Sequence, residues 1–222
     1  MALLVVSSEK GGSGKSTLAC HLAHAFSGAI KAGVVLVDAD HTATSRNWYA
    51  KRESNGFEPK LVVLPAPDNA FSVINDLCGR YGLVIVDLGA RDYQLINKLC
   101  LHADLWLCPT GPGINDLEST VSLGEGFERL GARHPKGAIP FHVVLNKIST
   151  NSGSNQESEV RNYLETMLPG VSVLESVLHA RKAFEDYSLD GRVVAEMAKR
   201  DGAKTAAEVA GIYDEVCGLL AA

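Results

Sequence analysis

Residues 2–17 read ALLVVSSEKGGSGKST and combine three features in one short stretch. The apolar run at 2–7 is typical of a strand that is buried on both faces. A glycine-rich segment follows, and the spacing of Leu18, Leu22 and Ala25 then predicts a helix that begins near Lys15. The N–H groups of such a loop, with the positive end of the helix dipole, bind phosphate oxygens. The stretch therefore predicts a phosphate-binding loop between a strand and a helix.

The loop also carries side chains suited to a nucleotide and its metal ion. Lys15 is placed to reach the β- and γ-phosphates, and the Ser16 hydroxyl is placed to bind Mg²⁺. The strict pattern GxxxxGK[ST] is not met, because Glu9 stands where its first glycine belongs. Lys10 adds a second cation to the loop. The alternative to a functional role for Lys10 is an ordinary solvated loop lysine. The residues expected to contact the nucleotide here are Gly11, Gly12, Ser13, Gly14, Lys15, Ser16 and Thr17.

The alternation of short apolar runs and longer amphipathic ones continues along the whole chain. The runs predict strands at 2–7, 34–37, 61–64, 83–86, 105–108, 141–145 and 171–174. Helices are predicted at 15–29, 42–53, 70–80, 94–102, 117–130, 155–167 and 205–220, and Ser154 with Glu157 fits a capping box for one of them. Continuous apolar strands favour a mostly parallel sheet with helices on both faces, an α/β fold. At 222 residues we expect one domain, 1–222.

Composition narrows the classes of function. The chain is 46% apolar, and no apolar run approaches the roughly 18 residues of a membrane span. The first residues carry no basic charge before their apolar run, so we expect no signal peptide and a cytoplasmic protein. The five cysteines form no CxxC pair, which favours free thiols. A net charge of −5 gives no general attraction to nucleic acid, so any such binding requires a local basic patch.

Carboxylates follow two of the predicted strands. Asp38 and Asp40 are two residues apart at the end of one strand, and this spacing puts both on one side. Asp87 ends the apolar run at 83–86, a pattern in which the carboxylate holds Mg²⁺. The carboxyl ends of parallel strands are where ligands bind, so these residues should meet the glycine loop. Alternatively, Asp40 simply caps the following helix.

The segment KGGSGKS at 10–16 resembles the deviant Walker A motif of the ParA/MinD family of P-loop ATPases. The resemblance implies a three-layer P-loop NTPase fold with a mostly parallel, twisted sheet, and ATP and Mg²⁺ as cofactors. It also implies that Lys10 reaches across a dimer interface to the phosphates held by the partner subunit. It assigns Asp40 to orienting or activating the attacking water and Asp38 to the magnesium environment. Lys10, Lys15 and Asp40 are thus the catalytic candidates, and Ser16, Asp38 and Asp87 the metal candidates.

The resemblance extends beyond the glycine loop. Asn146 stands where relatives supply an adenine contact, and because the guanine-reading NKxD pattern fails after Lys147, ATP is favoured over GTP. Asp116 opens a predicted helix, where an N-cap is the usual role. Partition ATPases of the family bind DNA through C-terminal basic residues, and the candidates are Arg181, Lys182, Arg192, Lys199, Arg200 and Lys204. Acidic residues alternate with them, so a solvated surface is the alternative.

These features resemble a short ParA-type ATPase of plasmid or chromosome partition. The resemblance implies that ATP-bound homodimers bind DNA non-specifically, associate with the nucleoid, and are released when a ParB-like partner stimulates hydrolysis. One alternative keeps the cycle but positions a protein cargo. A second is an ATP-dependent ligase of the dethiobiotin or cobyrinate synthetase type. A third is an electron carrier like the nitrogenase iron protein, with a cluster bridged between subunits through Cys100 or Cys108.

Overall fold

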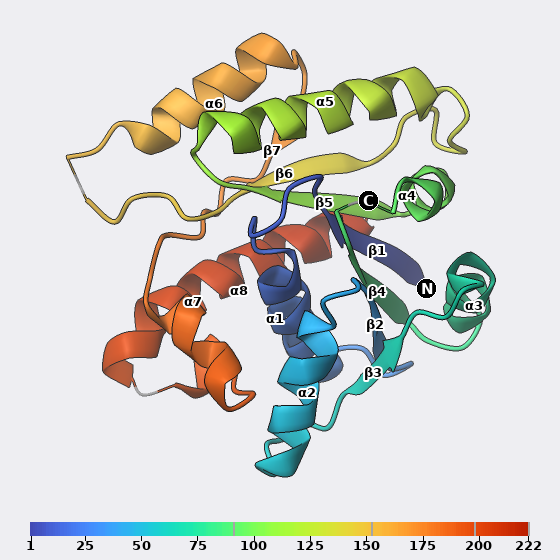
Figure 1. Cartoon of the computed structure of the whole chain (residues 1–222), viewed down its shortest axis with the longest axis vertical. Helices are drawn as coiled ribbons and strands as arrows, with labels where there is room; N and C mark the ends of the chain where they lie inside the picture. The colour runs from blue at the N-terminus through green and yellow to red at the C-terminus, as the bar shows by residue number, and fades with distance from the viewer. Residues whose placement is uncertain (91, 152, 198, 222) are drawn as a thin grey trace.

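The chain folds into a seven-stranded sheet in which every paired strand is parallel. The computed structural model describes residues 1–90, 92–151, 153–197 and 199–221, the side chains of 199–201 excepted. The strand order is β3-β2-β4-β1-β5-β6-β7 (Figure 1). The strands are β1 Ala2–Ser7, β2 Val34–Ala39, β3 Val62–Pro65, β4 Leu83–Leu88, β5 Leu105–Thr110, β6 Phe141–Leu145 and β7 Ser172–Val173. The parallel α/β fold predicted from the sequence is confirmed.

The helices lie close to their predicted positions. They are α1 Lys15–Ser27, α2 Thr44–Ser54, α3 Ala70–Cys78, α4 Tyr93–Leu99, α5 Ile114–Gly131, α6 Gln156–Met167, α7 Ala183–Asp186 and α8 Lys199–Ala221. The sequence patterns missed α7 and the 3₁₀ turns Tyr187–Leu189 and Val194–Glu196, because segments of three or four residues carry too little periodicity. Among the described residues, no helix is both long and apolar enough to cross a membrane.

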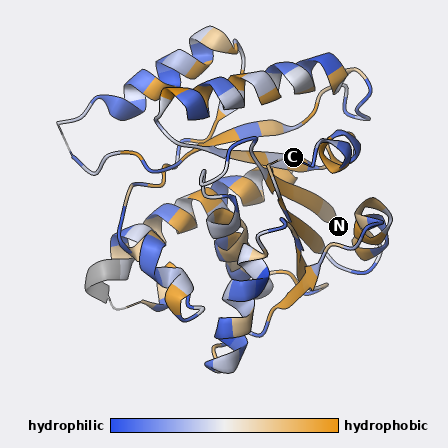
Figure 2. Cartoon of the chain, viewed as in Figure 1, coloured by the Kyte–Doolittle hydropathy of each residue, from blue (hydrophilic) through white to orange (hydrophobic). Residues whose placement is uncertain are grey.

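An apolar layer covers each face of the sheet. Figure 2 shows hydrophobic strands in the middle of the molecule and helices that carry hydrophilic residues on their outer sides. Along β1 the side chains alternate: Leu4 and Val6 face α1 and α8, while Leu3 and Val5 face the helices of the opposite layer. The first layer holds α1, α2, α7 and α8, and the second holds α3, α4, α5 and α6. Burial on both faces explains why the strands read as continuous apolar runs.

The topology brings the candidate site together. In the strand order, β2, β3 and β4 lie on one side of β1, whereas β5, β6 and β7 lie on the other side. The strand β1 therefore lies at the topological switch point. Ligands of open α/β sheets bind there, outside the carboxyl ends of the strands. In register, Asp38 of β2 pairs with Asp87 of β4, and Val6 of β1 pairs with Asp87. The strand-end carboxylates therefore lie beside the glycine loop, as predicted.

Two predicted helix caps are wrong. Helix α6 begins after Asn155, and Ser154 Oγ accepts from Gln156 N while Glu157 pairs with Arg161 at 2.9 Å, so no capping box forms. Helix α5 begins at Ile114 after Gly113, whose extended backbone ends the loop, and Asp116 therefore lies within the first turn rather than at the N-cap.

Candidate nucleotide-binding site

The glycine loop is held in a shape that only glycine adopts easily. Gly12 and Gly14 have φ values of 78° and 100°, in the left-handed region where a side chain would be strained. A Cβ on Gly14 would also overlap Asn146 Nδ2. Ser13 Oγ lies 2.6 Å from Ser8 Oγ, which ties the loop back to the end of β1. The loop is thus preformed for a ligand at the N-terminus of α1.

The two residues that follow β6 brace this loop. Asn146 Nδ2 donates to Ser13 O at 2.6 Å, and Asn146 Oδ1 accepts from Lys147 N at 2.9 Å. Lys147 Nζ donates to Gly12 O at 2.7 Å. Through these bonds Asn146 supports the phosphate loop. Its predicted contact with adenine stays a prediction.

Lys15 lies inside the loop and is only 5% exposed. Its Nζ donates to Lys10 O at 3.0 Å. Burial lowers the pKa of Lys15 below its usual value, and the nearby Asp87 and Asp40 oppose that change. A phosphate in the loop would place a negative charge beside Lys15 and so stabilise its charged form, which burial disfavours.

Lys10 is directed to a different partner. Its Nζ lies 3.4 Å from Asp116 Oδ1 in the first turn of α5, and the Lys10 side chain is 40% exposed. Lys10 is therefore an ion-paired residue at the rim of the site in the single chain, rather than a freely solvated lysine. Its predicted reach toward the phosphates of a second subunit stays a prediction.

Asp87 has the features expected of a metal-site carboxylate. Its Oδ2 accepts from Ser45 Oγ at 2.6 Å, whereas Oδ1 is buried without a hydrogen-bond partner among the described residues. Burial raises the pKa of Asp87 to about 6, although the Ser45 and Ser16 hydroxyls oppose the rise. A cation beside Oδ1 would satisfy that oxygen. Mg²⁺ bound to nucleotide phosphates needs only one or two protein oxygens, and Ser16 and Asp87 fit that role. In the described part of the chain, no group of three or more His, Cys, Asp or Glu side chains is arranged to hold a metal ion.

The two carboxylates after β2 have different surroundings. Asp38 is fully covered: Oδ1 accepts from Asp40 N at 3.1 Å, and Oδ2 accepts from Arg46 N at 2.9 Å and faces Arg46 Nε at 3.5 Å. These contacts show that Asp38 shapes the loop. Its assignment to the magnesium environment stays a prediction. Asp40 Oδ1 accepts from Thr42 N and Thr42 Oγ1. Asp40 does not cap α2, whose N-cap is Ala43 with φ 54°.

The glycine loop opens into a cavity of about 600 Å³. Its lining includes the loop, Lys15 and Asp40. Another wall is formed by His179, Ala180, Arg181 and Phe184. This wall follows the last strand, β7, at the carboxyl edge of the sheet, and that position is the sequence signal that could have identified it.

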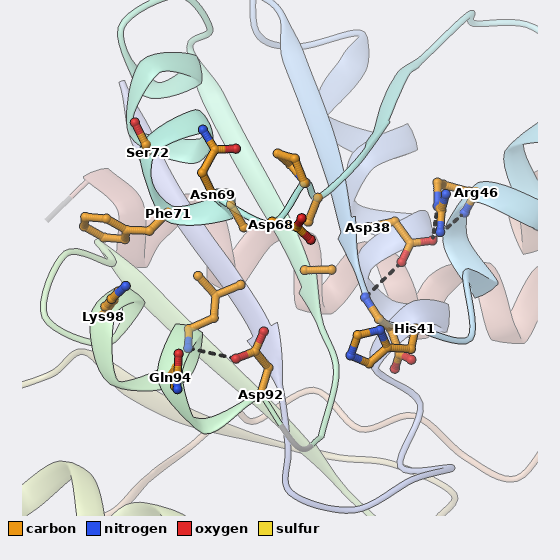
Figure 3. A pocket seen from close by; sticks show the side chains of 16 residues that line it. Asp38, His41, Arg46, Asp68, Asn69, Phe71, Ser72, Asp92, Gln94 and Lys98 are labelled. Carbon is orange, nitrogen blue, oxygen red and sulfur yellow. Dashed lines mark hydrogen bonds and ion pairs between the residues drawn. The ribbon is translucent and has the colours of Figure 1, made fainter.

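A second cavity, of about 560 Å³, is lined by the segment 38–41 (Figure 3). Asp68 and Asn69 from the loop after β3 line it, together with Asp92 and Lys98 around α4. Asp92 Oδ1 accepts from Leu95 N at 3.0 Å and caps α4. Asp40 thus lines both cavities.

Two of the predicted DNA-binding residues, Arg181 and Arg192, form ion pairs within the chain. Arg181 Nη2 lies 2.7 Å from Glu208 Oε1, and Arg192 Nε lies 2.9 Å from Asp190 Oδ2. Lys182 and Lys204 are exposed. The side chains of Lys199 and Arg200 lie outside the described residues. Because Arg181 and Arg192 are paired with carboxylates, they contribute little net charge toward a polyanion.

The buried cysteines exclude one alternative. Cys100 and Cys108 are both 0% exposed, and each packs in the layer that contains α3, α4 and α5. All five cysteines are free thiols. A cluster shared between two subunits needs thiols at the surface, so the electron-carrier hypothesis is wrong for these two residues.

Together, a parallel sheet, a glycine loop at its switch point, a buried lysine and a strand-end aspartate define a nucleotide-binding α/β protein of the P-loop class. Residues 4–194 match the family described as the CobQ/CobB/MinD/ParA nucleotide-binding domain. The chain belongs to this family, and the resemblance inferred from the glycine loop is confirmed.

Comparison with individual proteins agrees with this assignment. The chain is 28% identical to "Maintenance of carboxysome distribution protein A" of Gloeobacter kilaueensis, over 96% of this chain and 93% of that protein. It is 25% identical to the protein of the same name from Halothiobacillus neapolitanus, over 96% and 95%. Its fold matches an ATP complex of a Cyanothece McdA variant with a TM-score of 0.71 and 17% identity, over 98% of this chain and 96% of that chain.

Proposed function

We propose that the protein is a Mg²⁺-dependent ATPase that acts as a nucleotide-operated dimerisation switch and positions a cargo. The observation that carries the proposal is the glycine loop with two lysines, Lys10 at its rim and Lys15 in its interior. A loop that only binds and hydrolyses nucleotide needs the interior lysine, Lys15, and has no need of a second lysine at its rim. The rim lysine is placed where a second subunit could approach.

The roles of the chain's own residues follow from the geometry. The loop N–H groups and Lys15 bind the phosphates, and Ser16 and Asp87 hold the metal ion, which neutralises phosphate charge. Asp40, along the side of the cavity, positions the attacking water. Lys10 leaves Asp116 and completes the phosphate site of the second copy. Since one water-positioning carboxylate without an added cation gives slow turnover, we expect hydrolysis to depend on dimerisation and on a stimulating partner.

The relatives favour a protein cargo over a plasmid or chromosome. Two proteins named for carboxysome distribution align with 96% of this chain. We therefore propose the cargo-positioning alternative, in which ATP-bound dimers bind a DNA surface non-specifically and a cargo-bound partner releases them. Partition of DNA with a ParB-like partner uses the same cycle and remains the second candidate. The ligase alternative predicts turnover of a metabolite without any response to DNA.

The test measures ATPase rate and DNA retention with ATP or ADP, at low and moderate salt, for wild type, Lys10→Ala and Asp40→Ala. We expect wild type to be retained only with ATP and to lose retention steeply as salt rises. Lys10→Ala should not be retained, and Asp40→Ala should stay retained without hydrolysis. Retention of wild type that is equal with ATP and ADP would contradict the switch.

A further inference from the structure

Two carboxylates of α8 hold the segment 175–181, which leads from β7 into the nucleotide cavity. Glu215 Oε2 accepts from Glu175 N at 2.9 Å, and Glu215 Oε1 accepts from Ser176 N at 2.7 Å. Seven residues earlier on the helix, Glu208 Oε2 accepts from His179 N at 3.1 Å. Three main-chain N–H groups of this segment are therefore bonded to α8, while Leu178 N donates to Leu145 O of β6 and Ala180 N donates to Ile148 O.

Glu208 makes further bonds to the side chains of the same segment. Its Oε1 lies 2.8 Å from His179 Nδ1 and 2.8 Å from Arg181 Nε, and Arg181 Nη2 lies 2.7 Å away. The Glu208 side chain is only 12% exposed. Bonds of a partly buried carboxylate to a guanidinium are among the stronger ones in proteins. One carboxylate thus holds the backbone of His179 and the side chains of His179 and Arg181.

The support for Glu208 is rigid. Ile212 and Val216 of α8 are 0% exposed and belong to the apolar layer that also contains α1. Phe26 of α1 packs against Tyr213 of α8 with 4.7 Å between ring centroids. Helix α1 begins at the glycine loop, so the phosphate end of the cavity and the Glu208 side chain are mounted on two packed helices.

We propose that Glu208 is the positioning residue for the nucleoside end of the nucleotide cavity. This inference rests on the proposed nucleotide-binding function. Glu208 itself does not line the cavity, whereas His179 and Arg181, which it bonds, and Ala180 between them do. These residues follow β7, which lies three strands from β1, so their wall lies away from the phosphate loop that follows β1. Losing Glu208 should therefore loosen contacts to base and ribose and leave contacts to phosphate unchanged. A merely structural role would weaken both equally.

The experiment compares the affinities of wild type and Glu208→Gln for ATP and for inorganic tripolyphosphate, both with Mg²⁺. Tripolyphosphate occupies the phosphate loop but has no nucleoside. A glutamine amide has only one accepting oxygen, so it cannot accept at once from His179 N and from Arg181 as Glu208 does. The loss of a charge-assisted bond predicts ATP binding about tenfold weaker. Tripolyphosphate affinity should not change. Asp214→Asn, at an exposed carboxylate on the same helix, is the charge-matched control and should leave both affinities unchanged.

Unchanged ATP affinity in a folded Glu208→Gln protein, or an equal loss for both ligands, would overturn the inference. If thermal unfolding shows that this variant is not folded, Arg181→Met carries the same comparison with the same expected result. The proposed function is tested separately by Lys15→Ala. If wild type binds neither ligand, or if Lys15→Ala binds both normally, it is the nucleotide-site proposal that fails.

Discussion

Lys10 and Asp116 form an ion pair of 3.4 Å within a single chain, between the glycine loop and the first turn of α5. The side chains are 40% and 28% exposed, so the pair lies at the rim of the site. Under the proposed cycle, Lys10 has to leave Asp116 before it can contact the phosphates of a second subunit. Asp116 then competes with the phosphates of the second subunit for Lys10.

Asp116→Asn should therefore favour the ATP-bound dimer. An exposed ion pair contributes up to about 1 kcal/mol, and two pairs are released per dimer, so dimerisation should become up to about thirtyfold tighter. Sedimentation equilibrium with a non-hydrolysable ATP analogue measures the change. Weaker dimerisation of the variant would mean that Asp116 stabilises the dimer instead.

Asp87→Asn should separate stability from nucleotide binding. Folding raises the pKa of Asp87 to about 6 from an ordinary 3.8. Above pH 6 the charged carboxylate therefore destabilises the fold by about 3 kcal/mol, and this cost disappears as the pH falls toward 3.8. The nucleotide-free variant should thus be more stable than wild type at pH 7 and equal to it near pH 4. Denaturant unfolding at both pH values checks this.

The same variant should lose Mg²⁺-dependent ATP binding, because the amide cannot replace an anionic oxygen beside the metal ion. Titration of ATP with and without Mg²⁺ provides the comparison. An Asp87→Asn protein that binds MgATP as tightly as wild type would remove Asp87 from the metal site.

Asn146→Ala should weaken binding of ATP, GTP and tripolyphosphate by similar factors. Its amide braces Ser13 O in the phosphate loop, so its loss disturbs contacts to phosphate that are common to all three ligands. Competition binding gives the three ratios. A selective loss of ATP over GTP would instead support Asn146 as the residue that reads the base.

Glu196→Gln should destabilise the fold by about 3 kcal/mol, because it removes one partner of a largely buried ion pair. Arg52 is fully buried and bonds both oxygens of Glu196 at 2.8 Å. Burial by itself raises the pKa of Glu196, but bonds from Arg52, His24 and Val193 N lower that pKa to about 2. The difference from wild type should be present at pH 7 and shrink as pH falls from 4.5 toward 2. A constant difference over that range would exclude the charge as its origin.

Local signals made much of the fold predictable. The apolar run of β1, the glycines after it and the helix spacing of Leu18 and Leu22 all lie within one short stretch. The strand-end carboxylates Asp40 and Asp87 were predictable because the edge of a parallel sheet gathers them.

Contacts between distant parts of the chain were not predictable in the same way. Asn146 bonds a carbonyl 133 positions earlier, and Arg52 bonds Glu196 144 positions later. The pairing of Arg181 with Glu208 likewise depends on how α8 packs on the sheet. No periodicity in the sequence encodes such partners, so the bonds that Asn146, Asp38 and Arg181 make in the folded chain were not predictable.

The central claim is that Lys10 completes the nucleotide site of a second copy of the chain. Its most direct test is the mass of wild type and Lys10→Ala in solution with ATP analogue or ADP, with nucleotide affinity of the monomer measured in parallel. We expect wild type to dimerise with the analogue only, and Lys10→Ala to bind the analogue yet stay monomeric. A Lys10→Ala protein that dimerises as readily as wild type would contradict the claim.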